Sequence, residues 1–330
     1  MSVLVTGGAG YIGSHMVHEL TDAGRDVVVL DNLTTGFKWA LPPSAKLVVG
    51  DIGDQDLALA IFEKHGVDAI IHFAGSIVVP ESVADPLGYY LNNTVKSRAL
   101  MAAAVNGGVK QFIFSSTAAV YGMAKEMPVR ETTLLEPMSP YGSSKLMTEI
   151  MLRDTAIAHD FRYVALRYFN VAGADPKGRT GQSTKGATHL IKVACETALG
   201  KRSSMEVFGT DYATPDGTCV RDYIHVKDLA RAHVAALQHL NNGGKSDIFN
   251  CGYGKGYSVL EVIEAVRRVS NRKLDAKLSP RRAGDPEQIV ASSDKIRSQL
   301  GWKPEYDDLD LIVEHALAWE SHLAKRNAAA

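Results

Sequence analysis

The glycine-rich segment at residues 7–13, Gly-Gly-Ala-Gly-Tyr-Ile-Gly, constrains the possible folds more than any other part of this sequence. It directly follows an apolar, β-branched run at residues 2–6 and precedes a helix-compatible stretch. One glycine allows a tight turn, a second lets the backbone approach a pyrophosphate, and the last lets the following helix pack on the strand. The helix N-terminus then faces the anion. The segment therefore predicts a strand, a turn and a helix that bind a dinucleotide.

Short apolar runs alternate with longer helix-compatible stretches through the first half of the chain. The runs lie at residues 2–6, 26–30, 46–49, 69–73, 112–115 and 163–168. This alternation is typical of a parallel sheet with helices on both faces. We therefore predict an α/β fold, in which a Rossmann doubly wound parallel sheet carries a smaller mixed α/β C-terminal substrate lobe.

The sequence pattern changes near residue 170, where glycine- and proline-containing loops begin to separate shorter predicted elements. The predicted boundaries are residues 1–172 for the dinucleotide-binding domain and 173–330 for the second lobe. A segment near 221–238 is expected to return to the first domain, because residues 222–226 have the pattern of a buried strand. Residues 258–261, Ser-Val-Leu-Glu, predict a capping box that opens a helix.

Composition and charge exclude several classes of partner. The chain has 330 residues, 45% of them hydrophobic, a net charge of −1 and no block of like charges, so we predict neither a nucleic-acid nor a membrane partner. Three widely spaced cysteines favour reduced thiols, and residues 1–6 have no signal-peptide pattern; both favour a cytoplasmic location. The eleven histidines show no metal-ligand spacing, so no metal is predicted.

Acidic residues after the second and third predicted strands indicate which dinucleotide binds. Asp31 lies about 20 residues beyond the glycine segment, where a carboxylate accepts hydrogen bonds from ribose hydroxyls and repels a 2′-phosphate. Asn32 follows it and no arginine is adjacent, so NAD is preferred over NADP. Asp51 and Ile52, after the third strand, are predicted to contact adenine.

Tyr141 and Lys145 head a helix-compatible run that extends to about residue 158. Residues at i and i+4 lie on the same helix face. A phenol has a pKa of about 10, so its use as a base near neutral pH requires nearby positive charge. A second hydroxyl-rich segment, residues 115–117 in Ser-Ser-Thr, follows another predicted strand. Both segments point to one catalytic site.

These features together resemble the extended short-chain dehydrogenases, and within that family the UDP-glucose 4-epimerases. The resemblance also includes residues 167–170 in Arg-Tyr-Phe-Asn, residues 221–226 in Arg-Asp-Tyr-Ile-His-Val, and residues 280–285 in Pro-Arg-Arg-Ala-Gly-Asp. It covers nearly the whole chain. It implies a homodimer, packed through the helices that follow Asn93 and Tyr141.

The resemblance also implies a role for each matching residue. The catalytic residues would be Tyr141 as the base for the C4 hydroxyl, Lys145 as its activator and ribose ligand, and Thr117 as the hydroxyl that bonds the reacting oxygen. The cofactor residues would be Gly7, Gly10, Tyr11, Ile12, Gly13, Asp31, Asn32, Asp51, Ile52, Phe73, Ala74, Gly75, Asn93, Ser115, Tyr141, Lys145 and Tyr168. The substrate residues would be Thr117, Asn170, His189, Leu190, Phe208, Arg221, Tyr223, Arg282 and Asp285.

The implied reaction is NAD-dependent 4-epimerisation of a UDP-hexose through a 4-keto intermediate, with hydride transferred to bound NAD and returned. A 4-epimerase for a UDP-N-acetylhexosamine, UDP-pentose or UDP-uronate stays open. A dehydratase or decarboxylase is disfavoured, because Ala118 and Ala119 replace the acidic pair of the dehydratases. A noncatalytic NAD-sensing protein is the alternative from another class, although both Tyr141 and Lys145 are present.

Three positions depart from the family pattern. Ile77 replaces a lysine near the cofactor phosphates, which predicts a weaker hold on the cofactor. His189 replaces an amide side chain that contacts the substrate. Ile289 replaces a large aromatic residue beside the sugar, which predicts a roomier pocket.

Overall fold

A seven-stranded parallel sheet forms the centre of the protein in the computed structural model, which describes residues 2–282 and 284–329. The strand order is β10-β6-β5-β4-β1-β2-β3, and every neighbouring pair is parallel. The strands are β1 (Ser2–Thr6), β2 (Asp26–Asp31), β3 (Lys46–Val49), β4 (Val67–His72), β5 (Gln111–Thr117), β6 (Arg162–Tyr168) and β10 (Asp247–Cys251). The predicted fold class is confirmed.

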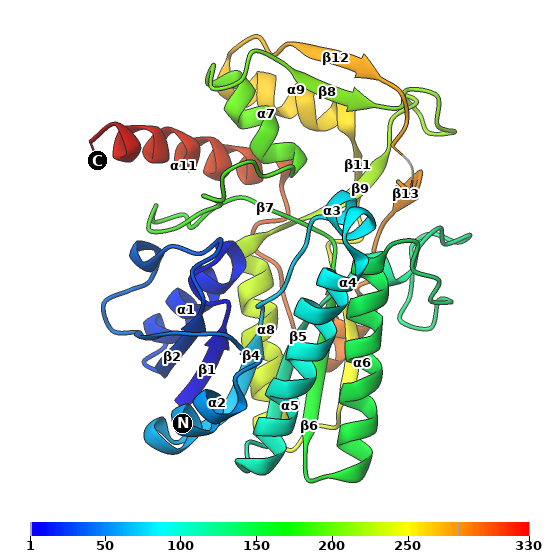
Figure 1. The fold of residues 1–330 in the computed structure, drawn as a ribbon. Helices are drawn as coiled ribbons and strands as arrows, with labels where there is room; N and C mark the ends of the chain where they lie inside the picture. Colours follow the sequence, from blue (N-terminus) through cyan, green and yellow to red (C-terminus); the bar gives the residue numbers. More distant parts are fainter. Residues whose placement is uncertain (1, 283, 330) are drawn as a thin grey trace.

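Helices cover both faces of this sheet (Figure 1). On one face, α1 (Tyr11–Asp22) and α8 (Val226–Asn241) pack on inward side chains such as Val3 and Val5. On the other face, α2 (Gln55–His65), α5 (Lys96–Asn106) and α6 (Pro140–Ala158) pack on the alternate side chains, including Leu4. Both sides of the central strands, such as β1 and β5, are therefore buried, which explains their continuous apolar runs in the sequence.

The chain reverses its direction of winding between β1 and β4. From β1 it proceeds to β2 and β3 on one side, whereas β4, β5 and β6 follow on the other side. In sheets of this topology the ligand binds at the carboxyl edge, beside the loops that follow the two strands at the reversal, here β1 and β4. Residues 7–13 and 73–75 occupy these two loops, so topology alone brings both predicted cofactor segments together.

A second lobe lies beyond that carboxyl edge (Figure 1). Its sheets consist of β7 (Asn170–Ala172), β9 (Val220–His225), β11 (Gly256–Ser258) and β13 (Gln288–Ile289), and of β8 (Met205–Phe208) paired with β12 (Ala276–Ser279). Its helices are α7 (Leu190–Ala198), α9 (Val259–Ser270) and α11 (Leu309–Ala329), whereas α10 (Asp294–Leu300) packs against β10 and α8 of the central sheet. The predicted capping box at α9 is present, with both Ser258 and Glu261 hydrogen bonds formed.

The second half of the chain contributes to both lobes. The strand expected at residues 222–226 pairs with β7, β11 and β13 and does not join the seven-stranded sheet. Helix α8 returns to pack against α1, and β10 pairs with β6. The domain boundary at residue 172 stays a prediction.

Short helical segments complete the fold and lie mainly near the carboxyl edge. They are η1 (Lys38–Ala40), α3 (Val79–Ala84), α4 (Pro86–Tyr89), the π-helical segment η2 (Tyr90–Val95) and η3 (Ala118–Val120). Within residues 2–282 and 284–329, every helix is too short or too polar to cross a lipid bilayer.

Candidate active site

The glycine-rich loop after β1 is packed so closely that side chains would not fit. Gly7 has φ +67°, and a Cβ there would lie 2.7 Å from the Ala74 nitrogen in the loop after β4. A Cβ on Gly13 would lie 2.1 Å from the Gly7 carbonyl oxygen. Gly10 precedes α1 with no side-chain cap, so the first amides of α1 stay available to an anion. The loop fits the pyrophosphate of a dinucleotide.

Asp31, at the end of β2, lies beside the glycine-rich loop and is hydrogen-bonded to it. Its carboxylate accepts hydrogen bonds from the Ala9 amide at 2.9 Å and the Leu33 amide at 2.8 Å. Each carboxylate oxygen has two lone pairs, so Asp31 can still accept bonds from ribose hydroxyls. Asn32 follows it at the surface. Tyr11 uses its hydroxyl to donate to the Gly173 carbonyl at 2.7 Å, so the phenol ties α1 to the second lobe.

Asp51 has a partner that the sequence did not reveal. Its carboxylate forms an ion pair with Lys96 on α5 at 2.5 Å and accepts the Gly53 amide at 2.8 Å. Ile52 beside it is buried. Lys96 is 45 residues away in sequence, and no local pattern signals such a pairing.

The loop after β4 is held by Asn93 in the π-helical segment η2. The Asn93 side chain accepts the Ser76 amide at 2.7 Å and donates to the Ser76 carbonyl at 2.9 Å and to the Ser144 hydroxyl at 3.0 Å. Its Oδ1 lies 2.9 Å from where a Cβ on Gly75 would be. Asn93 thus fixes the loop 73–76 against α6. π-Helical turns are frequent at functional sites. Ser76 and Ser144, which Asn93 binds, were not among the predicted site residues.

Tyr141, Lys145 and Thr117 lie together at the carboxyl edge of the sheet. Tyr141 stands in the first turn of α6, whose N-cap Ser139 accepts the Gly142 amide. Its phenol hydrogen-bonds the Thr117 hydroxyl at the end of β5. Lys145, one turn further along α6, is buried and donates to the Ser115 carbonyl at 2.9 Å. Its Nζ is 3.6 Å from where a Cβ on Gly75 would be, which places it against the cofactor loops.

The ionisation of this pair depends on burial. Tyr141 retains some exposed surface, yet burial raises the pKa of its phenol, and the Thr117 hydrogen bond only partly offsets this. Burial lowers the pKa of Lys145 to about 8, so its ammonium is still mostly charged at neutral pH. The net effect keeps the Tyr141 phenol protonated near neutral pH in the protein alone. The expected activation of the phenol therefore requires additional positive charge at the site.

Ser115 and Tyr168 form the wall behind Lys145. Their hydroxyls hydrogen-bond each other across β5 and β6, and burial raises the pKa of Tyr168. Phe73 packs against His233 of α8 on the same side of the sheet, with ring centroids 4.7 Å apart.

A buried ion pair that the sequence did not reveal lies beneath Thr117. Arg167 on β6 binds both carboxylate oxygens of Glu149 on α6 at 2.6 and 2.9 Å, and both side chains are almost fully buried. Ser116 donates to the same carboxylate at 2.5 Å. The pair joins α6 to β6, and the Ser116 hydrogen bond joins α6 to the end of β5, so both contacts help to hold Tyr141 opposite Thr117.

Four of the predicted substrate residues line one pocket in the second lobe, formed by β7, β9, α7, α11 and the loops beside them. These residues are Asn170, His189, Leu190 and Tyr223. Asn170 and Tyr223 are paired in register on β7 and β9, and their side chains are hydrogen-bonded. His189 precedes α7, so the N-terminal amides of that helix also face this region. His189 Nδ1 is 2.7 Å from Gln182 Nε2, a partner absent from the prediction.

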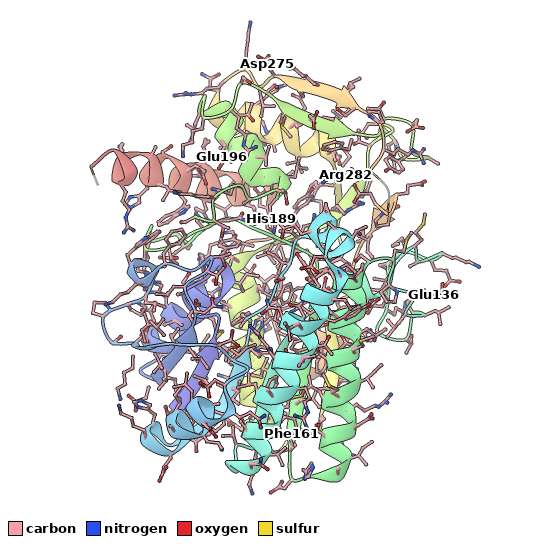
Figure 2. The ribbon with its side chains drawn as sticks, viewed as in Figure 1. Glu136, Phe161, His189, Glu196, Asp275 and Arg282 are labelled. Carbon is pink, nitrogen blue, oxygen red and sulfur yellow. The ribbon has the colours of Figure 1, made fainter. Side chains whose placement is uncertain are left out.

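The other predicted substrate residues form a second group next to the first. Arg282 lies over the Phe208 ring, with Cζ 4.3 Å from the centroid. Asp285 is 3.4 Å from Arg282 Nε and 3.9 Å from Arg221 Nη2. Arg221 and Tyr223 are two residues apart on β9, which joins the two groups. His189 and Arg282 lie between the lobes, whereas Phe161 is at the opposite end of the sheet (Figure 2).

The remaining departures from the family pattern lie in different surroundings. Ile77 is half exposed after β4. Ile289 is buried against Ala118 and Phe169 and pairs in register with Arg221. Across residues 2–282 and 284–329, no three His, Cys, Asp or Glu side chains are grouped as a metal site.

The sheet topology, the glycine cradle and the Tyr141–Lys145 pair define a dinucleotide-dependent enzyme of the short-chain dehydrogenase class. The model of the NAD dependent epimerase/dehydratase family matches residues 3–252. The chain belongs to this family, so it is an enzyme that uses NAD. The assignment to the family and the predicted cofactor are confirmed.

Relatives of known name match almost the entire chain. The UDP-glucose 4-epimerase of Azospirillum brasilense is 58% identical over 321 residues, covering 97% of this chain and 92% of the relative. The crystal structure of UDP-glucose 4-epimerase from Brucella ovis in complex with NAD is 44% identical, with a TM-score of 0.93 over 96% of this chain and 97% of that one. The UDP-Glc/GlcNAc 4-epimerase of Campylobacter jejuni is 48% identical, with a TM-score of 0.85 over 97% and 99%.

Proposed function

We propose that this protein interconverts UDP-galactose and UDP-glucose by inverting C4 of the hexose. The observation that carries the proposal is the contact between Tyr141 and Thr117, placed beside Lys145 and the glycine cradle. The naming of its relatives as UDP-glucose 4-epimerases supports the choice of substrate.

The protein supplies the proton chemistry. Tyr141 removes the proton from the C4 hydroxyl, and Thr117, whose hydroxyl already bonds the phenol, donates to the reacting oxygen. Lys145 provides a positive charge on the same helix face and binds the ribose. The chemistry that bound NAD would supply is reversible hydride transfer at C4, which permits return of the hydride to the opposite face. Gly7, Gly10 and Gly13 would hold its pyrophosphate, and Asp31 its ribose.

The second lobe would hold the nucleotide and leave the sugar free to turn. Arg221 and Arg282 are the cations suited to the diphosphate, since a guanidinium binds phosphate through two hydrogen bonds. Phe208 and Leu190 supply apolar surface for the base. Inversion requires that the sugar itself be held weakly, because a tightly bound ring could not present its opposite face.

We expect the purified protein to carry NAD and to convert UDP-galactose to UDP-glucose without net consumption of nicotinamide. Anomeric NMR of the sugars and absorbance at the NADH band measure both quantities in one sample. Steady accumulation of NADH together with a released oxidised sugar would instead identify a dehydrogenase.

A second substrate class is favoured by Ile289. This side chain is buried beside Ala118, directly after catalytic-site residue Thr117, and is smaller than an aromatic residue. The space that it leaves would accept the N-acetyl group at C2 of UDP-N-acetylglucosamine. The dual name of the Campylobacter jejuni relative supports this extension.

Replacement of Ile289 by Tyr should therefore lower kcat/KM for UDP-N-acetylglucosamine by at least tenfold relative to that for UDP-glucose. Apolar pockets discriminate by about 1–3 kcal/mol for one methylene group, which sets the scale. Both substrates are compared in the native protein and in the variant. An unchanged ratio would mean that Ile289 maintains packing and does not limit the pocket.

We also propose a cytoplasmic homodimer, formed through α6 and the helical segments before and after Asn93. Val83, Leu87, Leu91 and Val95 recur every four residues and are 53–78% exposed, an unusual run of apolar surface. Met147 and Ile150 add exposed apolar surface on neighbouring α6. The free, buried Cys195, Cys219 and Cys251 support a reducing location.

The dimer is tested by the mass in solution. Sedimentation equilibrium should give twice the chain mass of 35.6 kDa, and Leu87→Glu should shift the population toward monomer because it places a charge in the apolar stripe. Lys277→Glu, on exposed strand β12, is the matched control. A native protein of single-chain mass would contradict the proposal.

A further inference from the structure

Two tryptophans from distant parts of the chain meet at the boundary between the lobes. Trp39 belongs to η1, in the segment after β2, and Trp319 belongs to α11. Their ring centroids are 6.1 Å apart at an interplanar angle of 26°. Arg326 of α11 covers Trp39, with its Cζ 3.5 Å from the ring centroid. Offset stacking and a cation over an indole ring both stabilise such a contact. In Figure 1, α11 crosses above the segment that follows β2.

The Trp39 side of this contact leads directly to the cofactor loop. The Phe37 amide donates to the Ala9 carbonyl at 2.9 Å, and the Phe37 and Trp39 rings are 5.1 Å apart. A Cβ on Gly36 would lie 2.9 Å from Ala9, so the two backbones are in close contact. The Ala9 amide donates in turn to Asp31. Movement of Trp39 would therefore be transmitted to the glycine-rich loop and to the predicted ribose ligand.

The Trp319 side leads to the substrate pocket. The indole Nε1 donates to the Ser183 hydroxyl at 3.2 Å, and Gly181 packs directly against the ring. Trp319 also lines the pocket that contains His189. Trp319 is only 3% exposed, so it is a fixed support in the second lobe, whereas Trp39 is partly exposed.

We propose that Trp39 and Trp319 form a latch that slows the release of NAD. The latch anchors residues 36–39 to α11, and these residues hold the glycine-rich loop through Ala9. Opening of the loop by an outward movement of this segment then requires the indole pair to separate. Trp39 is thus a positioning residue for the cofactor and makes no direct contact with reacting atoms. The inference rests on the proposed function in one respect: a cofactor that is restored in each turnover is best kept bound between turnovers.

The rate of NAD release tests the latch independently of turnover. Native protein, Trp39→Ala, Trp39→Phe and Lys38→Ala are loaded with NAD and diluted into NAD-free buffer containing an NAD-consuming enzyme. Bound NAD is then quantified by chromatography at successive times. Trp39→Ala should release NAD at least tenfold faster, whereas Trp39→Phe retains an aromatic ring and should stay within threefold of native. Lys38→Ala alters an exposed neighbour in the same turn and should match native protein.

Two further measurements separate the latch from a general loss of structure. The affinity for UDP, measured by calorimetry, should change less than twofold in Trp39→Ala. If that variant does not fold, Arg326→Ala removes the cation over Trp39 from a partly exposed position and should speed NAD release severalfold. Native release rates in a folded Trp39→Ala, or in Arg326→Ala when Trp39→Ala does not fold, would overturn the proposal. So would an equal loss of UDP and NAD affinity. Faster NAD release in a protein without epimerase activity would support the latch and reject the proposed function.

Discussion

Replacement of Tyr141 by Phe is expected to lower kcat for UDP-galactose epimerisation by about 10²–10⁴-fold, the range for loss of a general base. The substitution removes one oxygen atom from the first turn of α6 and keeps the ring. That oxygen is the one that bonds Thr117, so the site would lose its proton acceptor while Thr117 and Lys145 stay in place. The affinity for UDP should change little, because the predicted nucleotide ligands lie in the second lobe.

Stopped-flow and steady-state kinetics with UDP-galactose measure the loss of turnover. The affinity for UDP, measured by calorimetry, serves as the internal reference. Tyr163→Phe is the matched control. It removes a buried phenol near the start of β6, at the opposite end of the sheet from Tyr141. Near-native turnover in Tyr141→Phe would show that Tyr141 is no more than a helix residue, and the base would have to be sought elsewhere.

Replacement of Lys145 by Ala should abolish turnover and also weaken the hold on NAD. The Lys145 ammonium is buried against Gly75 and donates to the Ser115 carbonyl, so it faces both the Tyr141 side of the site and the cofactor loops. With a pKa of about 8 the native side chain carries its charge at neutral pH and loses it as the pH rises through that value. The variant removes this charge at every pH.

The amount of NAD retained after gel filtration distinguishes the two variants. Tyr141→Phe should keep its NAD, whereas Lys145→Ala should lose most of it. The change also leaves the Ser115 carbonyl without its donor, at a cost of about 1–3 kcal/mol, so thermal unfolding is recorded in parallel. Full NAD retention in a folded Lys145→Ala would contradict the second role of this lysine and leave only electrostatic activation.

Several features followed from local sequence patterns because their physical causes are local. Short apolar, β-branched runs favoured strands at residues 2–6 and 46–49, and both have these bounds in the structure. The pitch of an α-helix places i and i+4 on one face, so Tyr141 and Lys145 had to be neighbours once residues 140–158 formed a helix. The glycine spacing likewise specified a turn into which no Cβ could fit.

The order of the strands and the partners of the buried charges were decided by the tertiary structure. The short strand at residues 247–251 could have paired with any exposed edge, and it pairs with β6, whereas β9 joins the second lobe. The Glu149–Arg167 ion pair and the Asn93 contacts to Ser76 and Ser144 join segments 17 or more residues apart.

The sequence by itself thus determined the α/β class, the dinucleotide cradle and the Tyr–Lys pair, since each depends on backbone geometry within a few residues. Only the tertiary structure decided that Lys96 binds Asp51, that Gln182 contacts His189 and that Trp39 meets Trp319. Such contacts depend on which packing of whole helices and sheets buries the most apolar surface while each buried polar group keeps a partner. No short segment of the sequence contains that information.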